Sequence, residues 1–300
     1  MSQSLPQETK VAAIIVTHNR LALLKENIAA LRGQTRTPDE IIVVNNGSTD
    51  GTAEWLKTQT GLTVIHQENL GSSGGQLIGI KTAFAHKHDW LWCMDDDVVP
   101  KVDALEQLLK SPKASDPRTG FLCSVVRWTD GSINLMTAPN VHPDYSSLMG
   151  LLPQGLLRVS SASFVSILFH RRAVAAKGLP LREMFLWFDD AEYTRRIADD
   201  FPSYQVLTSE AEHRTKTNYW VDFNHMAGLP VMQLSYGLRN FIFLRKWESS
   251  SKAAGWVRCV KSATRMQWRV WAQFSGADRW KLTRAVWLGV FFHPKIEMPE

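Results

Sequence analysis

An apolar segment that ends in three consecutive carboxylates constrains the fold of this chain more than any other feature. Residues 90–94 read Trp-Leu-Trp-Cys-Met, and Asp95, Asp96 and Asp97 follow directly. Such an apolar run is typical of a strand covered on both faces of a sheet. In an extended chain Asp95 and Asp97 point the same way, so we expect them to converge on one cation while Asp96 faces elsewhere. Adjacent carboxylates repel one another, and Mg²⁺ or Mn²⁺ would neutralise them. The alternative is a solvated acidic turn before a helix that begins near Val102.

Strand-like and helix-like segments alternate along the first 200 residues, which predicts an α/β fold with a mostly parallel sheet flanked by helices. We expect strands over residues 11–17, 40–44, 62–66, 90–94, 121–128, 159–169 and 204–208, and helices over 21–31, from 52, over 77–86 and over 189–198. Ligands bind at the carboxyl ends of the strands in such sheets. The segment 129–153 has no clear pattern, but it is long enough to be a substrate-facing loop.

A glycine-rich segment, residues 69–75, precedes the helix expected over 77–86. Glycines there would let the backbone approach a ligand closely, and amides at a helix N-terminus can bind an anion. The spacing matches neither a P-loop nor the GxGxxG pattern. The loop alone therefore does not predict nucleotide binding.

A second acidic pair, Asp189 and Asp190, follows the apolar residues 184–188 at the start of a helix. Asp189 is a reasonable N-cap, and acidic residues are favoured in a first helical turn. In a partly desolvated site one carboxylate could instead serve as a general base. His213 follows an acidic stretch, and a lone histidine is more often structural than ligating.

Three widely spaced cysteines, Cys93, Cys123 and Cys259, suggest neither a disulfide framework nor a zinc site. The polar segment 1–10 lacks the apolar core of a signal peptide, and no apolar run reaches the roughly 18 residues of a spanning helix. We therefore expect a cytoplasmic protein that does not cross a bilayer.

The C-terminal region is basic and rich in tryptophan. From residue 241 onward eleven cations stand against four anions, which leaves a net charge of −2 on the first 240 residues. Six of the twelve tryptophans lie in this part: Trp247, Trp256, Trp268, Trp271, Trp280 and Trp287. Tryptophan among basic residues on amphipathic helices is typical of a membrane interface, although packing in a helical core remains open. We expect a polar tail over residues 1–10, the α/β domain over 11–218 and this helical region over 219–300.

Five motifs together resemble the family 2 inverting glycosyltransferases of GT-A fold, which use sugar nucleotides. They are VAAIIVTHNR at 11–20, EIIVVNNGSTDGT at 40–52, ENLGSSGG at 68–75, MDDD at 94–97 and FLWFDDAEY at 185–193. Within the family the pattern is most similar to bacterial galactofuranosyltransferases, which use UDP-galactofuranose, and next to rhamnosyltransferases of polysaccharide assembly. One departure is Asn45-Asn46, where many members carry Asp-Asp or Asp-Asn.

The resemblance implies a role for each of these residues. Asp95, Asp97 and His213 would hold Mn²⁺ or Mg²⁺, and Asp190 would be the general base. The donor would contact Thr17, Asn19, Arg20, Asn46, Asn69, Gly74, Gly75 and Asp96. The acceptor would contact Trp187, Asp189 and Glu192, with Trp187 stacking on a sugar.

The expected function is transfer of a sugar, galactofuranose first among the candidates, to a glycan or lipid-linked acceptor at the inner face of the cytoplasmic membrane. A rhamnosyltransferase or another hexosyltransferase is the alternative, followed by a non-catalytic sugar-nucleotide-binding module. A nucleotidylyltransferase would usually carry a glycine-rich stretch with Arg and Lys after the first strand, where this chain has Thr17-His18-Asn19-Arg20. With sugar-nucleotide motifs preceding the basic region, we expect no nucleic-acid partner.

Overall fold

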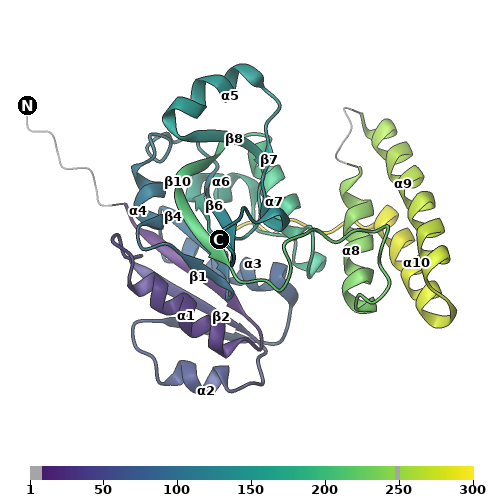
Figure 1. Ribbon diagram of the computed structural model, residues 1–300, viewed down its shortest axis with the longest axis horizontal. Coiled ribbons are helices and arrows are strands. Elements are labelled where there is room, and N and C mark those ends of the chain that lie inside the picture. Colours follow the sequence, from purple (N-terminus) through teal and green to yellow (C-terminus); the bar gives the residue numbers. More distant parts are fainter. Residues whose placement is uncertain (1–8, 247–250) are drawn as a thin grey trace, which may run out of the picture.

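The computed structural model describes residues 9–246 and 251–300 and shows an α/β domain followed by a helical bundle (Figure 1). The strands are β1 (Val11–Thr17), β2 (Glu40–Asn46), β3 (Thr63–Gln67), β4 (Trp90–Asp95), β5 (Val98–Pro100), β6 (Phe121–Trp128), β7 (Asn140–Val141), β8 (Leu156–Ser161), β9 (Ile167–His170) and β10 (Ser203–His213). The α-helices are α1 (Leu21–Arg32), α2 (Thr52–Lys57), α3 (Gly71–Ala85), α4 (Ala104–Lys110), α5 (Tyr145–Leu151), α6 (Arg171–Lys177), α7 (Asp189–Ala198), α8 (Val231–Leu244), α9 (Lys252–Gln273) and α10 (Gly276–Phe291). Short 3₁₀ helices are η1 (Leu135–Thr137), η2 (Leu152–Gln154) and η3 (Arg182–Met184).

All the strands belong to one sheet, with the order β3-β2-β1-β4-β9-β6-β10-β8-β7 and with β5 paired to β10. The pairs among β3, β2, β1 and β4 are parallel, as is the pair of β6 with β10. β9 runs antiparallel between β4 and β6, and β5 and β8 run antiparallel to β10. The α/β prediction is confirmed, but the sheet is mixed rather than mostly parallel.

Helices cover both faces of the sheet, which explains why its central strands are continuous apolar runs. On β1 the side chains of Val11, Ala13 and Ile15 face a core with α1, α2 and α4, whereas Ala12 and Ile14 face a core with α3, α6 and α7. Alternate side chains of one strand point to opposite faces, so every position of such a strand is buried. Because β1, β2, β3 and β4 are parallel, their carboxyl ends lie at the same edge of the sheet, and the polar motifs follow them there.

The structure departs from the sequence-based prediction in four segments. α3 begins at residue 71, not 77, so the glycine-rich segment is mostly helical. The strand expected over 159–169 is divided into β8 and β9, and β10 extends to His213 instead of ending at 208. The unassigned connection 129–153 contains η1, β7 and α5.

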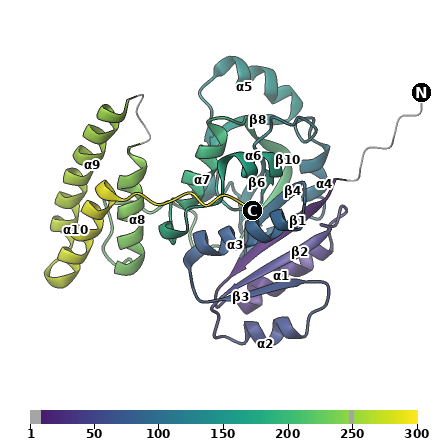
Figure 2. The ribbon, with the colours of Figure 1, turned by 180° about the vertical axis from the view of Figure 1, so that it is seen from behind.

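The bundle of α8, α9 and α10 has its own apolar core and lies beside the α/β domain (Figure 1). After α10 the chain is extended and returns to the α/β domain, where Figure 2 shows it approaching α3. There Leu179 N donates to Glu297 O (2.8 Å), and Lys81 Nζ pairs with Glu297 (2.6 Å). Trp247 lies outside the described residues, and within them no helix is long and apolar enough to span a membrane.

Candidate active site

The three carboxylates lie at the carboxyl end of β4, in the turn that leads to β5. Asp95 is the last residue of β4, and Asp96 and Asp97 follow it with only 4% exposure each. The strand therefore ends before Asp97, and the expected alternation does not extend to it. Asp96 Oδ2 instead accepts hydrogen bonds from Thr17 Oγ1 (2.8 Å) and from the backbone N of His18 (3.3 Å). Thr17, predicted to contact the donor, thus orients Asp96.

Two basic side chains contact the triplet. Arg20 Nη1 contacts Asp97 Oδ2 and lies 3.4 Å from Asp96 Oδ1, and His213 Nε2 lies 3.2 Å from Asp97 Oδ1. Burial raises the pKa of Asp96 to about 6, although Arg20 opposes the rise. Burial also acts to raise the pKa of Asp97, but His213 and Arg20 hold it below its usual value. Desolvation and its two acidic neighbours raise the pKa of Asp95 well above the usual range.

The chemistry of the predicted metal ligands suits a divalent cation. Asp95 and Asp97 offer the oxygen donors that Mn²⁺ and Mg²⁺ prefer, and His213 adds an imidazole nitrogen. Asp97 Oδ1 is buried and lies 3.2 Å from His213 Nε2, so two of the three predicted ligands already lie side by side. The ligand atoms of these three side chains are nevertheless not all close enough together to hold one ion in the present arrangement. Among the described residues, the one group of metal-ligating side chains whose ligand atoms all lie within 4.8 Å of one another is at another place in the fold.

Asn46 and Asn69 organise the connection between β3 and α3. Asn46 Oδ1 accepts from Gln67 Nε2 (2.9 Å) and from Leu70 N (3.0 Å), and its Nδ2 donates to Gly71 O (2.9 Å). Asn69 Oδ1 accepts from Gly71 N (2.9 Å). Both asparagines also line the cavity described below. Much of the hydrogen-bonding capacity of the two amides is therefore used within the chain.

Three other residues predicted to contact the donor lie outside the cavity lining. Asn19 has a φ of 55°, and its Oδ1 accepts from Thr49 N (2.6 Å), so it joins two loops. Gly74 and Gly75 lie inside α3, and a Cβ added at Gly75 would meet Val16 Cγ1 at 2.4 Å. The prediction that these two glycines lie in a loop is wrong: Gly75 allows α3 to pack closely on β1, whereas an added Cβ at Gly74 would lie 2.5 Å from Leu70 Cβ.

The apolar segment before the second acidic pair has an uncommon backbone. Phe185, Trp187 and Phe188 have φ values of 66°, 64° and 66°. Non-glycine residues rarely adopt this left-handed region, and each such residue costs on the order of 1–3 kcal/mol. The surrounding structure must therefore hold the segment in place.

Asn240 of α8 supplies much of this support. It is fully buried, and its Nδ2 lies 2.9 Å from Met184 O, 3.1 Å from Leu186 O and 2.9 Å from Trp187 O. One turn earlier Gly237 allows close contact, since an added Cβ would lie 2.2 Å from Trp187 Cε3. The helical bundle thus positions a segment of the candidate active site.

We expect Gly237→Ala to destabilise the protein by about 1–3 kcal/mol, because the new methyl group displaces the ring of Trp187. Transfer activity should fall with it. Gly150→Ala is the matched control: this glycine is also helical, but an added Cβ meets nothing within 4 Å. Thermal melts of both variants decide the matter, and equal melting temperatures would contradict the positioning role of α8.

Asp189 and Asp190 open α7 with different environments. The N-cap position belongs to Phe188, and no side-chain capping bond forms, so the predicted N-cap role of Asp189 is wrong. Asp189 is 4% exposed, and its Oδ2 is buried without a partner although Ser72 bonds to the carboxylate. Burial and the charge of Asp190 raise the pKa of Asp189 to about 8. Burial raises the pKa of Asp190 to about 6. The backbone N–H of Ala191, which donates to Asp190 Oδ1 (2.6 Å), opposes this rise.

The other two predicted acceptor contacts differ in position. Glu192 is 6% exposed and forms a two-pronged ion pair with Arg196, at 2.8 and 3.0 Å. Glu192 does not line the cavity, and its ion pair joins two successive turns of α7. Trp187 is half-buried and does line the cavity, and part of its ring packs on Gly237 of α8.

A cavity of about 660 Å³ brings these groups together, within the usual range for small-molecule sites. Its lining comprises Arg20, Asn46, Asn69, Asp95, Asp96, Asp97, Trp187, Asp189, Asp190 and His213 among the predicted site residues. It also includes Met136 and Thr137, which lie in the segment expected to face a substrate, and Trp220 and Met232 from the C-terminal region. The cavity therefore has walls from both parts of the chain.

Sequence reasoning missed His18, Ser72 and Asn240. His18 lines the cavity directly after β1, and its Nδ1 lies 2.9 Å from Asn46 O; its position at a strand end was a usable signal. Ser72 was hidden in a segment expected to be a loop. Nothing in the local sequence marks Asn240, because its partners lie more than fifty residues away.

Carboxylates and other polar groups thus converge near the carboxyl ends of the strands, where α/β proteins bind their ligands. Residues 12–174 match the family described as Glycosyl transferase family 2. That match covers more than half of the chain, which therefore belongs to this family.

Individual relatives agree with the family. Over 221 residues the chain is 28% identical to galactofuranosyltransferase GlfT1 of Mycolicibacterium smegmatis, covering 69% of this chain and 72% of that protein. It is 26% identical to poly-beta-1,6-N-acetyl-D-glucosamine synthase of Staphylococcus aureus (strain COL), covering 56% of this chain and 41% of the synthase. Among solved structures, GalNAc-T7 with UDP, GalNAc and Mn²⁺ matches with a TM-score of 0.59 at 15% identity, over 86% of this chain and 54% of that one. The protein is a glycosyltransferase with the GT-A fold.

Proposed function

We propose that this chain is an inverting, metal-dependent glycosyltransferase that transfers galactofuranose from UDP-galactofuranose to a glycan or lipid-linked glycan acceptor in cell-envelope synthesis. The observation that carries the proposal is the shared cavity, which is lined by the triplet Asp95–Asp97 with His213 and by the pair Asp189 and Asp190. The first group suits a nucleotide diphosphate with its cation, and the second suits an acceptor hydroxyl. The similarity to GlfT1 supports galactofuranose as the sugar.

In this proposal Asp190 takes the proton of the acceptor hydroxyl as the oxygen attacks the anomeric carbon and the bond to UDP breaks. Its carboxylate is the charged member of the acidic pair at neutral pH, since the pKa of Asp190 is about 6 and that of Asp189 about 8. Asp189 then remains protonated beside it. When burial separates the pKa values of two adjacent carboxyls in this way, the one with the lower pKa can act as a general base.

On the donor side, Asp95, Asp97 and His213 would hold Mn²⁺ or Mg²⁺, which supplies positive charge to offset the charge on departing UDP. Arg20 already contacts Asp96 and Asp97 and is half-exposed, so it can turn toward a diphosphate. Asn46 and Asn69 face the same cavity as donor contacts, and Trp187 offers a ring surface to a sugar.

The sugar and base are tested with a panel of UDP- and dTDP-sugars incubated with the purified protein, Mn²⁺ and a galactan acceptor. UDP-galactofuranose should give the greatest transfer and release of UDP. Preferential turnover of dTDP-rhamnose would contradict the donor and favour the rhamnosyltransferase alternative. Binding of UDP-galactofuranose without turnover by any sugar nucleotide would instead indicate a non-catalytic binding module.

The rate of transfer should depend on pH through Asp190. A base must be deprotonated, and burial has raised the pKa of this carboxyl from its usual value near 4 to about 6. Activity should therefore be lost as the pH falls through 6, by about tenfold per pH unit below it. A rate that stays constant between pH 7 and pH 5 would rule out this base.

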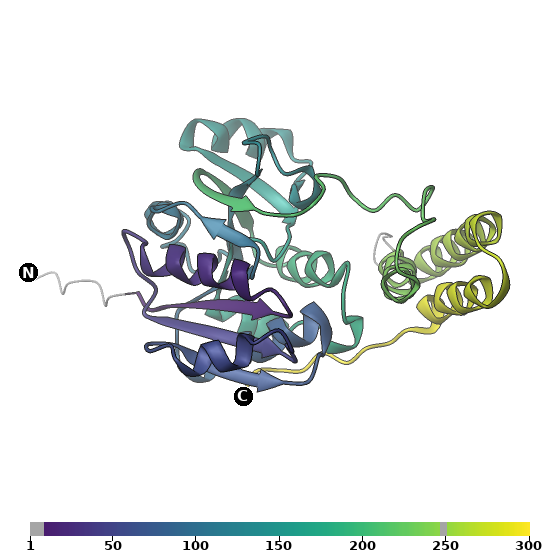
Figure 3. The same cartoon turned by 60° about the horizontal axis from the view of Figure 1, so that its bottom comes forward.

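We also propose that α9 and α10 place the enzyme on an anionic membrane. Trp268 and Trp280 are 70% and 64% exposed, and Trp280 meets the ring of Trp271 at 5.7 Å across the two helices. These helices lie at the end of the bundle away from the sheet (Figure 3). Exposed tryptophan beside basic residues suits an interface, whereas Trp287 is turned inward and bonds to Gln267 (2.7 Å).

The double variant Trp268→Ser and Trp280→Ser should bind vesicles of anionic lipid much more weakly than the natural chain. Binding of the natural chain should also weaken as salt rises, because screening acts over about 10 Å at 0.1 M. Tyr145→Ser is the matched control, since Tyr145 is 70% exposed on α5 of the other domain. Equal sedimentation of all three proteins with vesicles would contradict the membrane role.

A further inference from the structure

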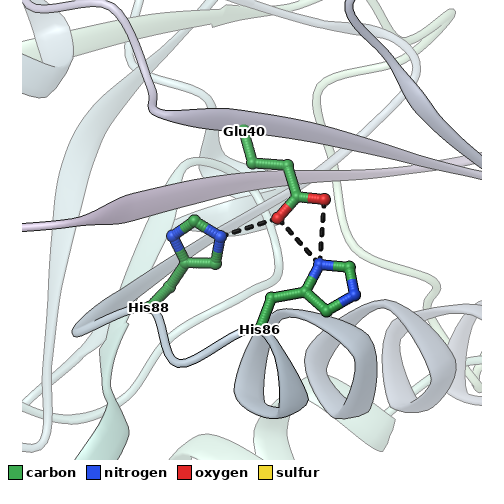
Figure 4. Close-up of side chains that lie close together, drawn as sticks. All are labelled: Glu40, His86 and His88. Carbon is green, nitrogen blue, oxygen red and sulfur yellow. Dashed lines mark hydrogen bonds and ion pairs between the residues drawn. The ribbon is translucent and has the colours of Figure 1, made fainter.

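A second group of chemically active side chains lies at the opposite edge of the sheet from the active site. Figure 4 shows the imidazoles of His86 and His88 turned toward the carboxylate of Glu40. His86 Nδ1 is 3.0 Å from both carboxylate oxygens, and His88 Nε2 is 2.7 Å from Oε2. The three ligand atoms lie within 4.8 Å of one another.

The local fold explains this convergence. Glu40 is the first residue of β2, and Thr63 at the start of β3 holds its Oε1 with a bond of 2.6 Å. α3 ends just before His86, and Lys87 has a φ of 63°. This left-handed residue reverses the chain direction at the helix end, so both flanking imidazoles reach the same carboxylate.

We propose that Glu40, His86 and His88 form a Zn²⁺ site that stabilises the fold. Two imidazoles and one carboxylate are a common donor set for zinc, with water in the fourth position. Bonds of about 2.0 Å at tetrahedral angles place ligand atoms about 3.3 Å apart. The two nitrogen–oxygen separations of 2.7 and 3.0 Å therefore need to open by about 0.3–0.6 Å. The two imidazole nitrogens lie within 4.8 Å of each other, and side-chain rotation can adjust that distance.

Exposure permits loading from solvent. The side chains of His86 and Glu40 are 46% and 19% exposed, whereas that of His88 is 7% exposed and provides a fixed ligand. His88 Nδ1 is buried without a hydrogen bond, so a proton placed there on zinc binding would lack an acceptor. Since an unpaired buried donor weakens binding, we expect loading at micromolar rather than much lower free zinc.

This site is separate from the catalytic metal site. Glu40 and Asn46 are the first and last residues of β2, and six residue steps along a strand span about 20 Å. Zinc at this edge would fasten the end of α3 to the start of β2. It would act on stability, so the proposal stands or falls independently of the glycosyl-transfer reaction.

The test is zinc titration of the tag-free, metal-stripped protein by calorimetry, together with thermal melts. The melting temperature of the natural chain should rise with the logarithm of free Zn²⁺. His86→Gln should weaken this binding at least tenfold yet leave the zinc-free melting temperature unchanged, because His86 is half-exposed. His225→Gln is the matched control: His225 has one carboxylate partner, Asp222 at 2.7 Å, and should leave zinc binding intact.

His213→Gln separates the two metal sites, since it should retain the zinc response that His86→Gln loses. Co²⁺ gives an independent signature: its visible absorption in the natural chain should disappear in His86→Gln. Equal zinc affinity in the natural chain and His86→Gln, or no zinc-dependent rise in melting temperature, would overturn the proposal and leave a hydrogen-bonded ion pair only.

Discussion

Asp190→Asn should lower the rate of transfer by roughly 10²–10⁴-fold, the usual contribution of a general base. The amide keeps the shape of the side chain but cannot accept the proton. Affinity for UDP-galactofuranose, measured by calorimetry, should be nearly unchanged because the proposed donor site lies at the other group of carboxylates. The pH dependence around 6 should disappear with the base.

Asp189→Asn is the control for that experiment. Asp189 has a pKa of about 8 because it is buried beside Asp190, so at pH 7 it is already neutral and an amide replaces a carboxyl of the same charge. The loss of activity should be much smaller than for Asp190→Asn. If Asp190→Asn transfers sugar at the natural rate, the base is another residue.

Asp95→Asn and Asp97→Asn should each abolish transfer while shifting the melting temperature of the metal-free protein in opposite directions. A buried carboxyl whose pKa is raised in the folded state lowers the free energy of unfolding at a pH where the unfolded chain would ionise it. Asp95 is such a carboxyl, so replacing it with a neutral amide should raise the melting temperature at pH 7. The pKa of Asp97 is lowered despite its burial, because His213 and Arg20 hold its charge. Asp97 therefore stabilises the fold above its unfolded pKa, and its loss should lower the melting temperature.

Activity and stability are measured on the same preparations, with EDTA for the melts and with Mn²⁺ restored for the assays. Full transfer by either variant would refute the assigned metal ligands. A shift of the same sign in both would refute the account of how Arg20 and His213 neutralise the triplet.

The strands that place the site were predictable because each is a continuous apolar run that ends in polar residues. β1 and β6 have the predicted bounds, and β4 differs by one residue. The triplet Asp95–Asp97 could be placed at the ligand-binding edge for the same reason, since it follows β4, whereas Asp189 and Asp190 open α7 and follow no strand. For these strands and for the residues that follow them, residue type and position along the strand were sufficient for the prediction.

Predictions failed where distant contacts decide the local structure. Gly74 and Gly75 were predicted to lie in a loop, but both lie inside α3, and an added Cβ at Gly75 would lie 2.4 Å from Val16 Cγ1 of β1. β10 reaches His213 because β5 and β6 pair with its final residues. The backbone of the segment before Asp189 depends on Asn240, far along the chain in a helix that local pattern assigned to a separate region.

The stereochemistry of the product tests the central claim most directly. If Asp190 activates the acceptor for a single in-line displacement, the new glycosidic bond must have the anomeric configuration opposite to that of the UDP-sugar. NMR of the disaccharide product formed from UDP-galactofuranose, with Mn²⁺ and a synthetic acceptor, should therefore show inversion. Retention of the donor configuration would contradict the proposed mechanism.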